Sequence, residues 1–205
     1  MMIIFQYKYN LLSLIDLKKI KKISKLKKLN ILDFGCGKGV WEKKFLKKKF
    51  INKIILYDKN KSLLGFLKKK YSHKKIVINF NKKNLLNKNI NLIIFSSVIQ
   101  YMSKKELNSF LSTVNKKYKT KPIYILINDF PNFNRFIELI LIPFINFKKF
   151  IYYFSLVFNK QYLSINYYRH NLSKNIFLNK IFIIRNIGYI GDMKFLRSKI
   201  LLIKK

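Results

Sequence analysis

The apolar residues of this chain follow two different spacings, and the change between them falls near residue 30. Before that point they recur every third residue with lysines in between, at Leu14, Leu17, Ile20, Ile23, Leu26 and Leu29. This spacing predicts a basic helix whose apolar stripe drifts around the helix axis. Two roles for it stay open: packing against the rest of the domain, or lying on a membrane whose anionic lipids attract the lysines.

From Asn30 onward, short apolar runs alternate with longer amphipathic segments. The runs predict five strands, at Ile31–Phe34, Lys53–Tyr57, Lys75–Phe80, Leu92–Phe95 and Ile123–Ile127. The intervening segments predict helices at Val40–Lys49, Lys61–Lys70 and Lys104–Tyr118. Their inward positions are expected to be Trp41, Phe45 and Leu46 in the first of these helices and Leu107, Phe110, Leu111 and Val114 in the last. Such alternation is typical of a parallel sheet covered by helices on both faces.

The alternation stops after Asp129, where a long aromatic and aliphatic segment, Phe130–Tyr168, begins. A membrane span needs about 20 apolar residues, whereas this segment is interrupted by Glu138, Pro143, Asn146, Lys148 and Lys149. We therefore expect a helical, lid-like insertion at about 130–170. A helix is expected at Ser173–Asn186, followed by a turn at Gly188-Tyr189. Two strands joined by a tight connection, Ile190–Phe195 and Lys199–Ile203, should then form an antiparallel hairpin at the sheet edge.

Length and composition favour one globular domain of 205 residues, half of them apolar. We divide it into an amphipathic segment, 1–29, and an α/β domain, 30–205. The net charge of +36 comes from 40 lysines and only four arginines, and the chain has no alanine. Residues with AT-rich codons are abundant, so coding bias accounts for much of the lysine. A solvated lysine surface is the favoured interpretation, and a polyanion-binding surface is the alternative.

Cys36 is the single cysteine, so it has no partner for an intramolecular disulfide. No Cys/His cluster has the spacing of zinc ligands, and no metal site is expected. Residues 1–15 lack the basic start and small-residue cleavage site of a secretory signal. These features favour a reducing cytoplasm.

Three of the six glycines, Gly35, Gly37 and Gly39, fall within five residues directly after the first predicted strand. Glycine adopts positive φ and lets the backbone approach a ligand closely, while the next helix directs its amide groups to the same place. The grouping predicts a nucleotide-binding turn. An ordinary strand-to-helix turn is the alternative.

The run Asp33-Phe34-Gly35-Cys36-Gly37-Lys38-Gly39 resembles the first motif of class I S-adenosylmethionine-dependent methyltransferases. The resemblance implies S-adenosyl-L-methionine as cofactor, with its methionine part above the loop that includes Cys36 and with Asp33 orienting it. A dinucleotide fingerprint would place the last glycine one residue later, where Val40 stands. NAD is therefore the less favoured ligand.

Further candidate cofactor contacts follow the later strands. Asp58, with Lys59 beside it, ends the second strand, where an acidic side chain accepts hydrogen bonds from ribose hydroxyls; an exposed turn aspartate is the alternative. Asn81 stands where the family usually has an aspartate for the adenine amino group. Ser96 and Ser97 lie in Asn91–Tyr101, which looks like the fourth motif with its acid replaced by Asn91; helix capping is the alternative role for the serines.

The resemblance also implies the architecture. It predicts a Rossmann-like α/β fold with a seven-stranded, mostly parallel sheet in the order 3-2-1-4-5-7-6, helices on both faces, and strand seven antiparallel. The helical insertion after strand five is not part of the family core.

Methyl transfer from a sulfonium needs mainly positioning and exclusion of water. A hydroxyl acceptor would benefit from a general base, and the candidate catalytic residues are Asp129 and His170. Turn capping by Asp129 and a plain loop position for His170 stay open as alternatives.

No Asn-Pro-Pro-Tyr or Asp-Pro-Pro-Tyr run follows the fourth strand, so the usual signature of amino-nucleobase methylation is absent. This favours a small-molecule, glycan or lipid-linked acceptor over DNA, and the apolar insertion favours a hydrophobic one. One alternative is an RNA methyltransferase that uses the lysine surface. Another is a non-catalytic protein of this fold at the inner face of a membrane.

Overall fold

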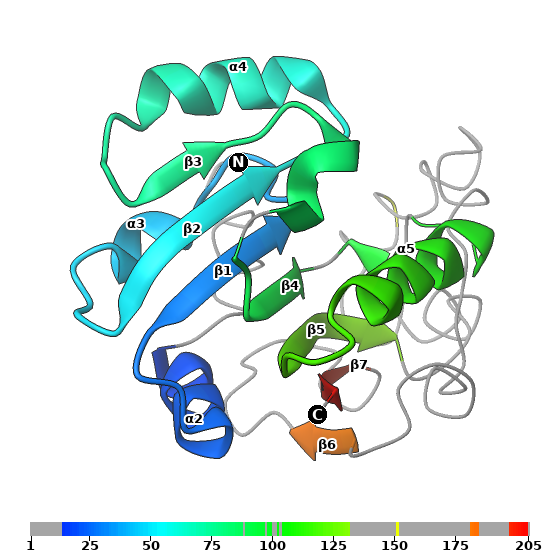
Figure 1. Cartoon of the computed structure of the whole chain (residues 1–205). Coiled ribbons are helices and arrows are strands. Elements are labelled where there is room, and N and C mark those ends of the chain that lie inside the picture. The colour runs from blue at the N-terminus through cyan, green and yellow to red at the C-terminus, as the bar shows by residue number, and fades with distance from the viewer. Residues whose placement is uncertain are drawn as a thin grey trace.

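The computed structural model describes residues 14–87, 89–96, 98–99, 102, 104–131, 151, 181–184 and 197–204 (Figure 1). Its helices are α2 (Leu14–Ser24), α3 (Glu42–Phe45), α4 (Lys61–Lys70), α5 (Lys104–Lys117) and the 3₁₀ helix η2 (Lys82–Asn87). Its strands are β1 (Leu29–Phe34), β2 (Ile51–Tyr57), β3 (Ile76–Ile78), β4 (Leu92–Ser96), β5 (Ile123–Pro131), β6 (Ile181–Ile184) and β7 (Arg197–Lys204).

The strands form one twisted sheet in which β1 lies between β2 and β4. The first five strands are all parallel, in the order 3-2-1-4-5, which confirms the prediction for this part. β7 pairs antiparallel with β5, and β6 pairs antiparallel with β7 at the sheet edge. The chain order therefore reverses between β1 and β4, which is where open α/β sheets place their ligands.

The sequence-based assignment of the last strands is partly wrong. Ile181–Ile184, expected within the helix Ser173–Asn186, forms strand β6. The run Ile-Phe-Ile-Ile has strong β propensity, and pairing with β7 satisfies its backbone. The expected strand Ile190–Phe195 lies within residues 185–196, between β6 and β7, and these are outside the described residues.

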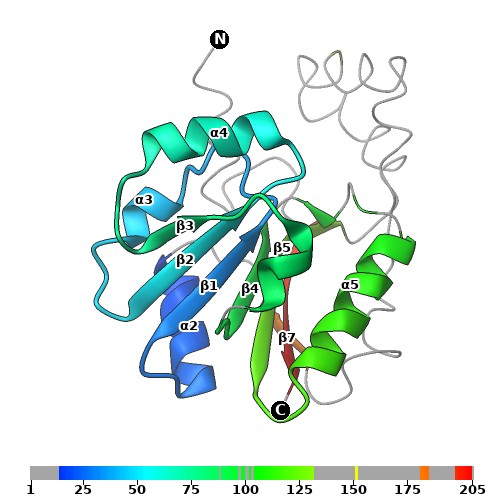
Figure 2. The same cartoon turned by 45° about the horizontal axis from the view of Figure 1, so that its top comes forward.

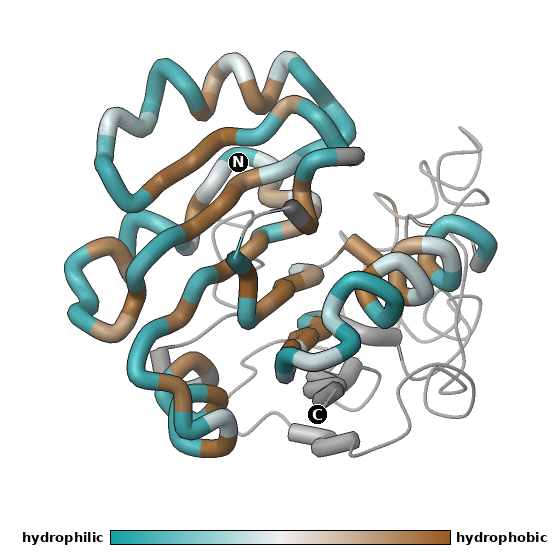
Figure 3. Tube along the Cα trace, viewed as in Figure 1, coloured by the Kyte–Doolittle hydropathy of each residue, from teal (hydrophilic) through white to brown (hydrophobic). Residues whose placement is uncertain are grey.

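Side chains on the two faces of the sheet form two apolar layers, each covered by helices. Leu17 and Ile20 of α2, Trp41 and Phe45 of α3 and Leu64 and Leu67 of α4 cover one face. The other face is covered by α5, whose predicted inward residues Leu107, Phe110, Leu111 and Val114 are all buried. In both views α3 and α4 lie toward the β2–β3 end of the sheet and α5 lies beside β4 and β5 (Figures 1 and 2). Hydrophobic residues follow the strands, and hydrophilic ones occupy the outer turns of the helices (Figure 3).

Helix α2 is shorter than the apolar stripe predicts. α2 ends at Ser24, and Lys25 adopts a left-handed conformation with φ of 55°, a common way for a helix to end. Leu29, the last residue of the stripe, is already the first residue of β1. Leu17 and Ile20 are fully buried, so α2 is part of the domain core.

The helix expected at Val40–Lys49 is a single turn, Glu42–Phe45. Trp41 stands at its start without a side-chain cap, and the lysine run that follows continues as turns before β2. The predicted inward residues Trp41, Phe45 and Leu46 are buried.

Most of the expected insertion at about 130–170 lies outside the described residues, although β5 continues through Phe130 to Pro131. Among the described residues, no helix has the length and apolar character needed to cross a membrane.

Candidate functional site

The three-glycine turn follows β1 at the carboxyl edge of the sheet, between the ends of β2 and β4. All three glycines have positive φ: 79° at Gly35, 55° at Gly37 and 60° at Gly39. Side-chain-bearing residues rarely adopt this conformation, which explains why glycine occupies each position. The predicted turn is therefore present in the backbone.

The three glycines differ in what surrounds them. A Cβ at Gly35 would overlap the side chain of Val98, and one at Gly39 would lie 2.7 Å from Cδ2 of Leu67. A Cβ at Gly37 would meet no atom of the described residues within 4 Å. Gly35 and Gly39 thus permit close packing within the protein, whereas the backbone at Gly37 borders open space.

Backbone hydrogen bonds fasten the turn to β2. The amides of Gly35 and Cys36 both donate to the carbonyl oxygen of Tyr57, at 2.7 and 3.1 Å. The amide of Gly39 donates to the carbonyl of Cys36 at 3.0 Å. These three hydrogen bonds restrain the backbone of the turn.

Asp58 joins the end of β2 to this turn. Its Oδ2 accepts from the amide of Gly37 at 2.9 Å and its Oδ1 accepts from the amide of Asn60 at 2.9 Å. A carboxylate can accept about four hydrogen bonds, so capacity for a ligand hydroxyl remains. The structure brings together Asp58 and Gly37, which are 21 residues apart in the sequence.

Two residues that the sequence analysis missed hold the far side of the turn. Lys70 Nζ, at the end of α4, donates to the carbonyl oxygens of Lys38 and Gly39 at 2.8 and 2.9 Å. The Tyr71 hydroxyl also donates to the Gly39 carbonyl. Burial, together with the nearby Glu42, Cys36 and Asp33, raises the pKa of Tyr71, so its hydroxyl stays a donor. No local sequence motif predicts these contacts, because they join segments about 30 residues apart.

Asp33 is fully buried at the end of β1, and it is accompanied by Glu42, which the sequence analysis also missed. Glu42 is equally buried at the start of α3. Burial, then the neighbouring Glu42 and Asp58, raise the pKa of Asp33 well above its usual range. Burial also raises the pKa of Glu42. The scarcity of acidic residues, eight in the chain, is the one sequence signal that could have singled out Glu42.

Cys36 is a buried, free cysteine within the turn. Burial and the neighbouring Asp33, Glu42 and Asp58 raise the pKa of its thiol far above neutrality. The thiol is therefore not a nucleophile, and Cys36 contributes its backbone and bulk to the turn.

Two other candidate contacts lie at the surface of the same edge. Lys59 is 93% exposed, and its Nζ lies 4.0 Å from Oε1 of Glu106 on α5. Asn81 lies between β3 and η2, where its backbone amide donates to Oδ1 of Asn79 at 3.1 Å. Both remain predictions as cofactor contacts.

Ser96 ends β4 in register with Asn128 of β5. Asn128 is fully buried, and its side-chain amide has no hydrogen-bond partner within the described part of the chain. The pairing of β5 with β7 shifts between Ile127 and Phe130, so the backbone of Asp129 lies at an irregularity on the carboxyl edge. Ser97 and His170 lie outside the described residues.

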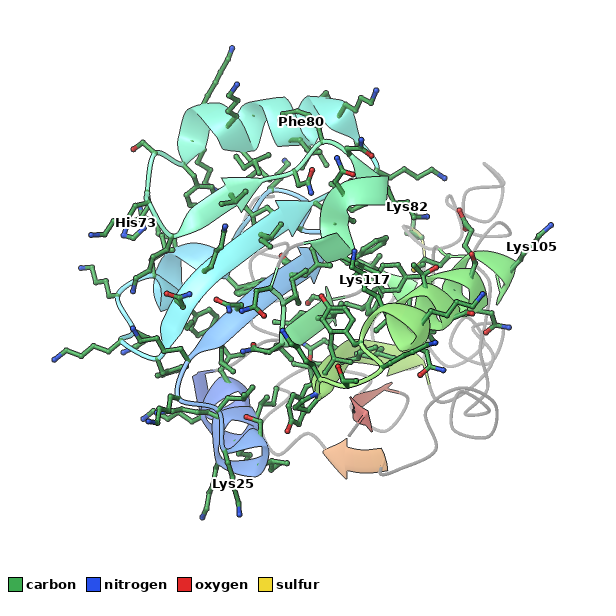
Figure 4. All side chains as sticks on the ribbon, in the orientation of Figure 1. Lys25, His73, Phe80, Lys82, Lys105 and Lys117 are labelled. Atoms are coloured by element: carbon green, nitrogen blue, oxygen red, sulfur yellow. The ribbon has the colours of Figure 1, made fainter. Side chains whose placement is uncertain are left out.

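Lysines project from separate parts of the molecule, as Lys25, Lys82 and Lys105 illustrate (Figure 4). A shallow hollow of about 420 Å³ is lined by lysines of α2 and the following turn, together with Leu26. These lining residues precede β1 in the chain, whereas the glycine turn follows it. Among the described residues, no group of His, Cys, Asp or Glu side chains could hold a metal ion.

Comparison with known proteins gives matches only at the level of structure. No protein-family sequence model matches the chain, and no curated protein does.

Several solved structures share its architecture at low sequence identity. The methyltransferase domain of bacterial CtHen1 is 15% identical, with a TM-score of 0.54 over 92% of this chain and 94% of that domain. Mycolic acid cyclopropane synthase CmaA1, solved with SAH and CTAB, is 10% identical, with a TM-score of 0.55 over 87% and 67% of the two chains. Magnesium protoporphyrin IX methyltransferase from Synechocystis PCC 6803, solved with SAH, is 9% identical, with a TM-score of 0.52 over 92% and 78%.

These enzymes and this chain share one scaffold. In this chain that scaffold has the parallel strand order 3-2-1-4-5, with the glycine turn after β1 and Asp58 after β2. The chain has the fold of the class I S-adenosylmethionine-dependent methyltransferases.

Proposed function

We propose that this protein is an S-adenosylmethionine-dependent methyltransferase acting on a small-molecule, glycan or lipid-linked acceptor. The proposal rests on one hydrogen bond: the backbone amide of Gly37, in the glycine turn, donates to Oδ2 of Asp58 at 2.9 Å. It places a carboxylate and a ligand-accessible backbone side by side at the point where the strand order reverses.

The residues present fit the cofactor. The open space beside Gly37 leaves room for the methionine part, which the family resemblance locates above this turn. The free capacity of the Asp58 carboxylate suits the ribose hydroxyls. Asn81 and Ser96 would border the adenine and the transferred group, respectively, by their places after β3 and at the end of β4.

When bound, S-adenosylmethionine supplies an activated methyl group on a positively charged sulfur. The chain's own contribution is to orient that group and to exclude water. Asp129, near the carboxyl end of β5, is the first candidate to accept a proton from a hydroxyl acceptor, and His170 is the second.

Ligand binding tests the cofactor directly. S-adenosylmethionine and S-adenosylhomocysteine at about 100 times their Kd should raise the melting temperature by about 5 °C or more, whereas NAD should not. Asp58→Ala should abolish the shift, because it removes both the link to Gly37 and the ribose acceptor. Glu106→Ala removes a carboxylate from the surface of α5 and is the control that should keep the shift. Stabilisation by NAD alone would contradict the proposal.

The acceptor class rests on the apolar composition of residues 130–170. Transfer of radiolabelled methyl groups to cell extract should label material soluble in organic solvent. Replacing Phe133–Phe158 by a short Gly/Ser linker should remove that labelling while S-adenosylhomocysteine still binds. Unchanged acceptor binding by the shortened protein would contradict the hydrophobic acceptor, and label sensitive to ribonuclease would favour RNA instead.

A further inference from the structure

The side chains of Lys70 and Tyr71, at the end of α4 and directly after it, supply donors to the second half of the glycine turn. Lys70 Nζ donates to the carbonyl oxygens of Lys38 and Gly39 at 2.8 and 2.9 Å. The Tyr71 hydroxyl donates to the Gly39 carbonyl as well. A carbonyl oxygen has two lone pairs, so this Lys70–Tyr71 pair uses its full capacity. Because the two donors share one acceptor, either can hold the turn when the other is lost.

Gly39 is the residue that lets the turn reach the Lys70–Tyr71 pair. It has a φ of 60°, and a Cβ at this position would lie 2.7 Å from Cδ2 of Leu67 and 2.9 Å from Cε2 of Tyr71. A side chain there would hold the turn away from α4 and lengthen the hydrogen bonds to the carbonyl. The third glycine of the turn therefore serves the contact with α4.

Lys70 is exposed, and its ammonium group is nevertheless held in one place. An exposed lysine usually gains little from a polar contact, because fixing its long side chain costs conformational entropy. Here Nζ lies 5.1 Å from the centre of the Tyr71 ring and 5.8 Å from that of Phe66. Both distances are within the range at which a cation is attracted to an aromatic ring. Two rings and two carbonyl oxygens thus fix the donor at the turn.

The turn is bonded to both ends of the segment that contains α4. Before the helix, Oδ2 of Asp58 accepts from the Gly37 amide at 2.9 Å. At its end, the Lys70–Tyr71 pair bonds the Gly39 carbonyl. Two fully buried leucines of α4 fix the helix against the sheet. The backbone from Gly37 to Gly39 is therefore restrained from one rigid element.

This restraint matters because the segment is rich in glycine. Glycine loses more conformational freedom than any other residue when it is ordered. A loop that becomes ordered only when a ligand binds weakens the affinity, whereas a loop already held avoids that cost.

We propose that Lys70 and Tyr71 are positioning residues that preorganise the glycine turn for the cofactor, and that they act jointly through the carbonyl oxygen of Gly39. This inference rests on the proposed function, since it assumes that the cofactor lies at the turn. The pair acts by holding the backbone and needs no contact with the cofactor.

Lys70→Met, Tyr71→Phe and the double variant test the pair. Methionine keeps an unbranched side chain without the ammonium group, and phenylalanine keeps the ring without the hydroxyl. Each single variant leaves one donor on the Gly39 carbonyl, and the double variant leaves none. Lys69→Met, at the adjacent exposed position of α4, is the matched control for the loss of one positive charge. Lys70→Arg retains a charged donor and tests rescue.

Calorimetry with S-adenosylhomocysteine measures the effect on binding. Each single variant should bind within about twofold of wild type, and the double variant should lose about tenfold or more, which exceeds the product of the single effects. Lys69→Met should bind like wild type, and Arg at position 70 combined with Tyr71→Phe should restore most of the loss. Wild-type affinity in the double variant would overturn the proposal, and so would an equal loss in Lys69→Met and Lys70→Met.

Amide hydrogen exchange in the ligand-free protein measures the restraint itself. The amides of Gly37 and Gly39 donate to Asp58 and Cys36 in the folded turn. In the double variant they should exchange about tenfold faster or more, while amides of β1 and β2 keep their wild-type rates and show that the sheet is intact. Unchanged exchange at both glycines would overturn the proposal. If wild type does not bind S-adenosylhomocysteine, the proposed function fails, and the exchange rates still decide whether the pair restrains the turn.

Discussion

At the scale of single residues, the site depends on which atoms can come close to the backbone at each glycine. Gly35 lets Val98 pack against the end of β1, and Gly37 leaves the backbone open toward the region proposed for the cofactor. Neighbouring positions of one motif therefore serve different purposes. The spacing of the glycines in the sequence does not distinguish the role of Gly35 from that of Gly37, and both have positive φ.

Alanine at these positions should separate stability from binding. Gly35→Ala should lower the free energy of unfolding by about 2–4 kcal/mol, because its Cβ would overlap Val98 and adopt a left-handed conformation. Gly37→Ala should cost about 1–2 kcal/mol of strain alone, yet weaken S-adenosylhomocysteine binding about tenfold or more. Urea unfolding and calorimetry measure the two effects. Equal loss of stability in both variants would contradict this division of roles.

At the scale of elements, α2 is a covering helix of the sheet. Its buried Leu17 and Ile20 lie in the same apolar layer as Trp41 and Phe45 of the short helix α3. The membrane-surface role considered from the lysine pattern therefore does not apply to these two side chains. Lysines of α2 instead line the shallow hollow on the outside of the molecule.

A pair of truncations tests whether α2 belongs to the cooperative unit. Leu17→Ala should lower the free energy of unfolding by about 2–5 kcal/mol, because it opens a cavity against the sheet. Ile23→Ala, at a position that is 38% exposed, should cost about 1 kcal/mol or less. Urea titration followed by circular dichroism measures both. If the two variants unfold at the same urea concentration, α2 is not part of the folded core.

At the scale of the whole molecule, positive charge is the dominant long-range term. The net charge is +36, and the lysines labelled in Figure 4 lie on different elements: Lys25 follows α2, Lys82 begins η2, and Lys105 and Lys117 belong to α5. Like charges so distributed repel one another and destabilise the compact state. The lysine surface thus weakens folding unless counterions screen it.

Salt should therefore stabilise this protein. Raising NaCl from about 0.1 M to about 1 M shortens the Debye length from about 10 Å to about 3 Å, and the free energy of unfolding should rise by about 1 kcal/mol or more. That gain corresponds to an increase of about 2–4 °C in melting temperature by calorimetry. KCl should act like NaCl, since screening depends on ionic strength. A melting temperature that falls with salt would mean that local ion pairs outweigh the repulsion.

The sequence by itself determined the features that arise from neighbouring residues. Periodicity located β1, α4 and α5 because burial of one face requires a repeating pattern, and three glycines within five residues identified a turn with positive φ. The length of α3 and the end of α2 were harder to predict, since lysine runs fit both helices and turns. Ile181–Ile184 was misassigned because its neighbour β7 decides its structure.

Only the tertiary structure decided which distant residues meet. Parallel strands bring Asp58 to Gly37, α4 brings Lys70 and Tyr71 to the same turn, and α3 brings Glu42 beside Asp33. A carboxyl group is ordinary in a sequence and becomes unusual only when burial removes its water and places a second carboxyl beside it. The glycine turn is therefore visible in the sequence, whereas the burial of Asp33 and Glu42 is a property of the fold.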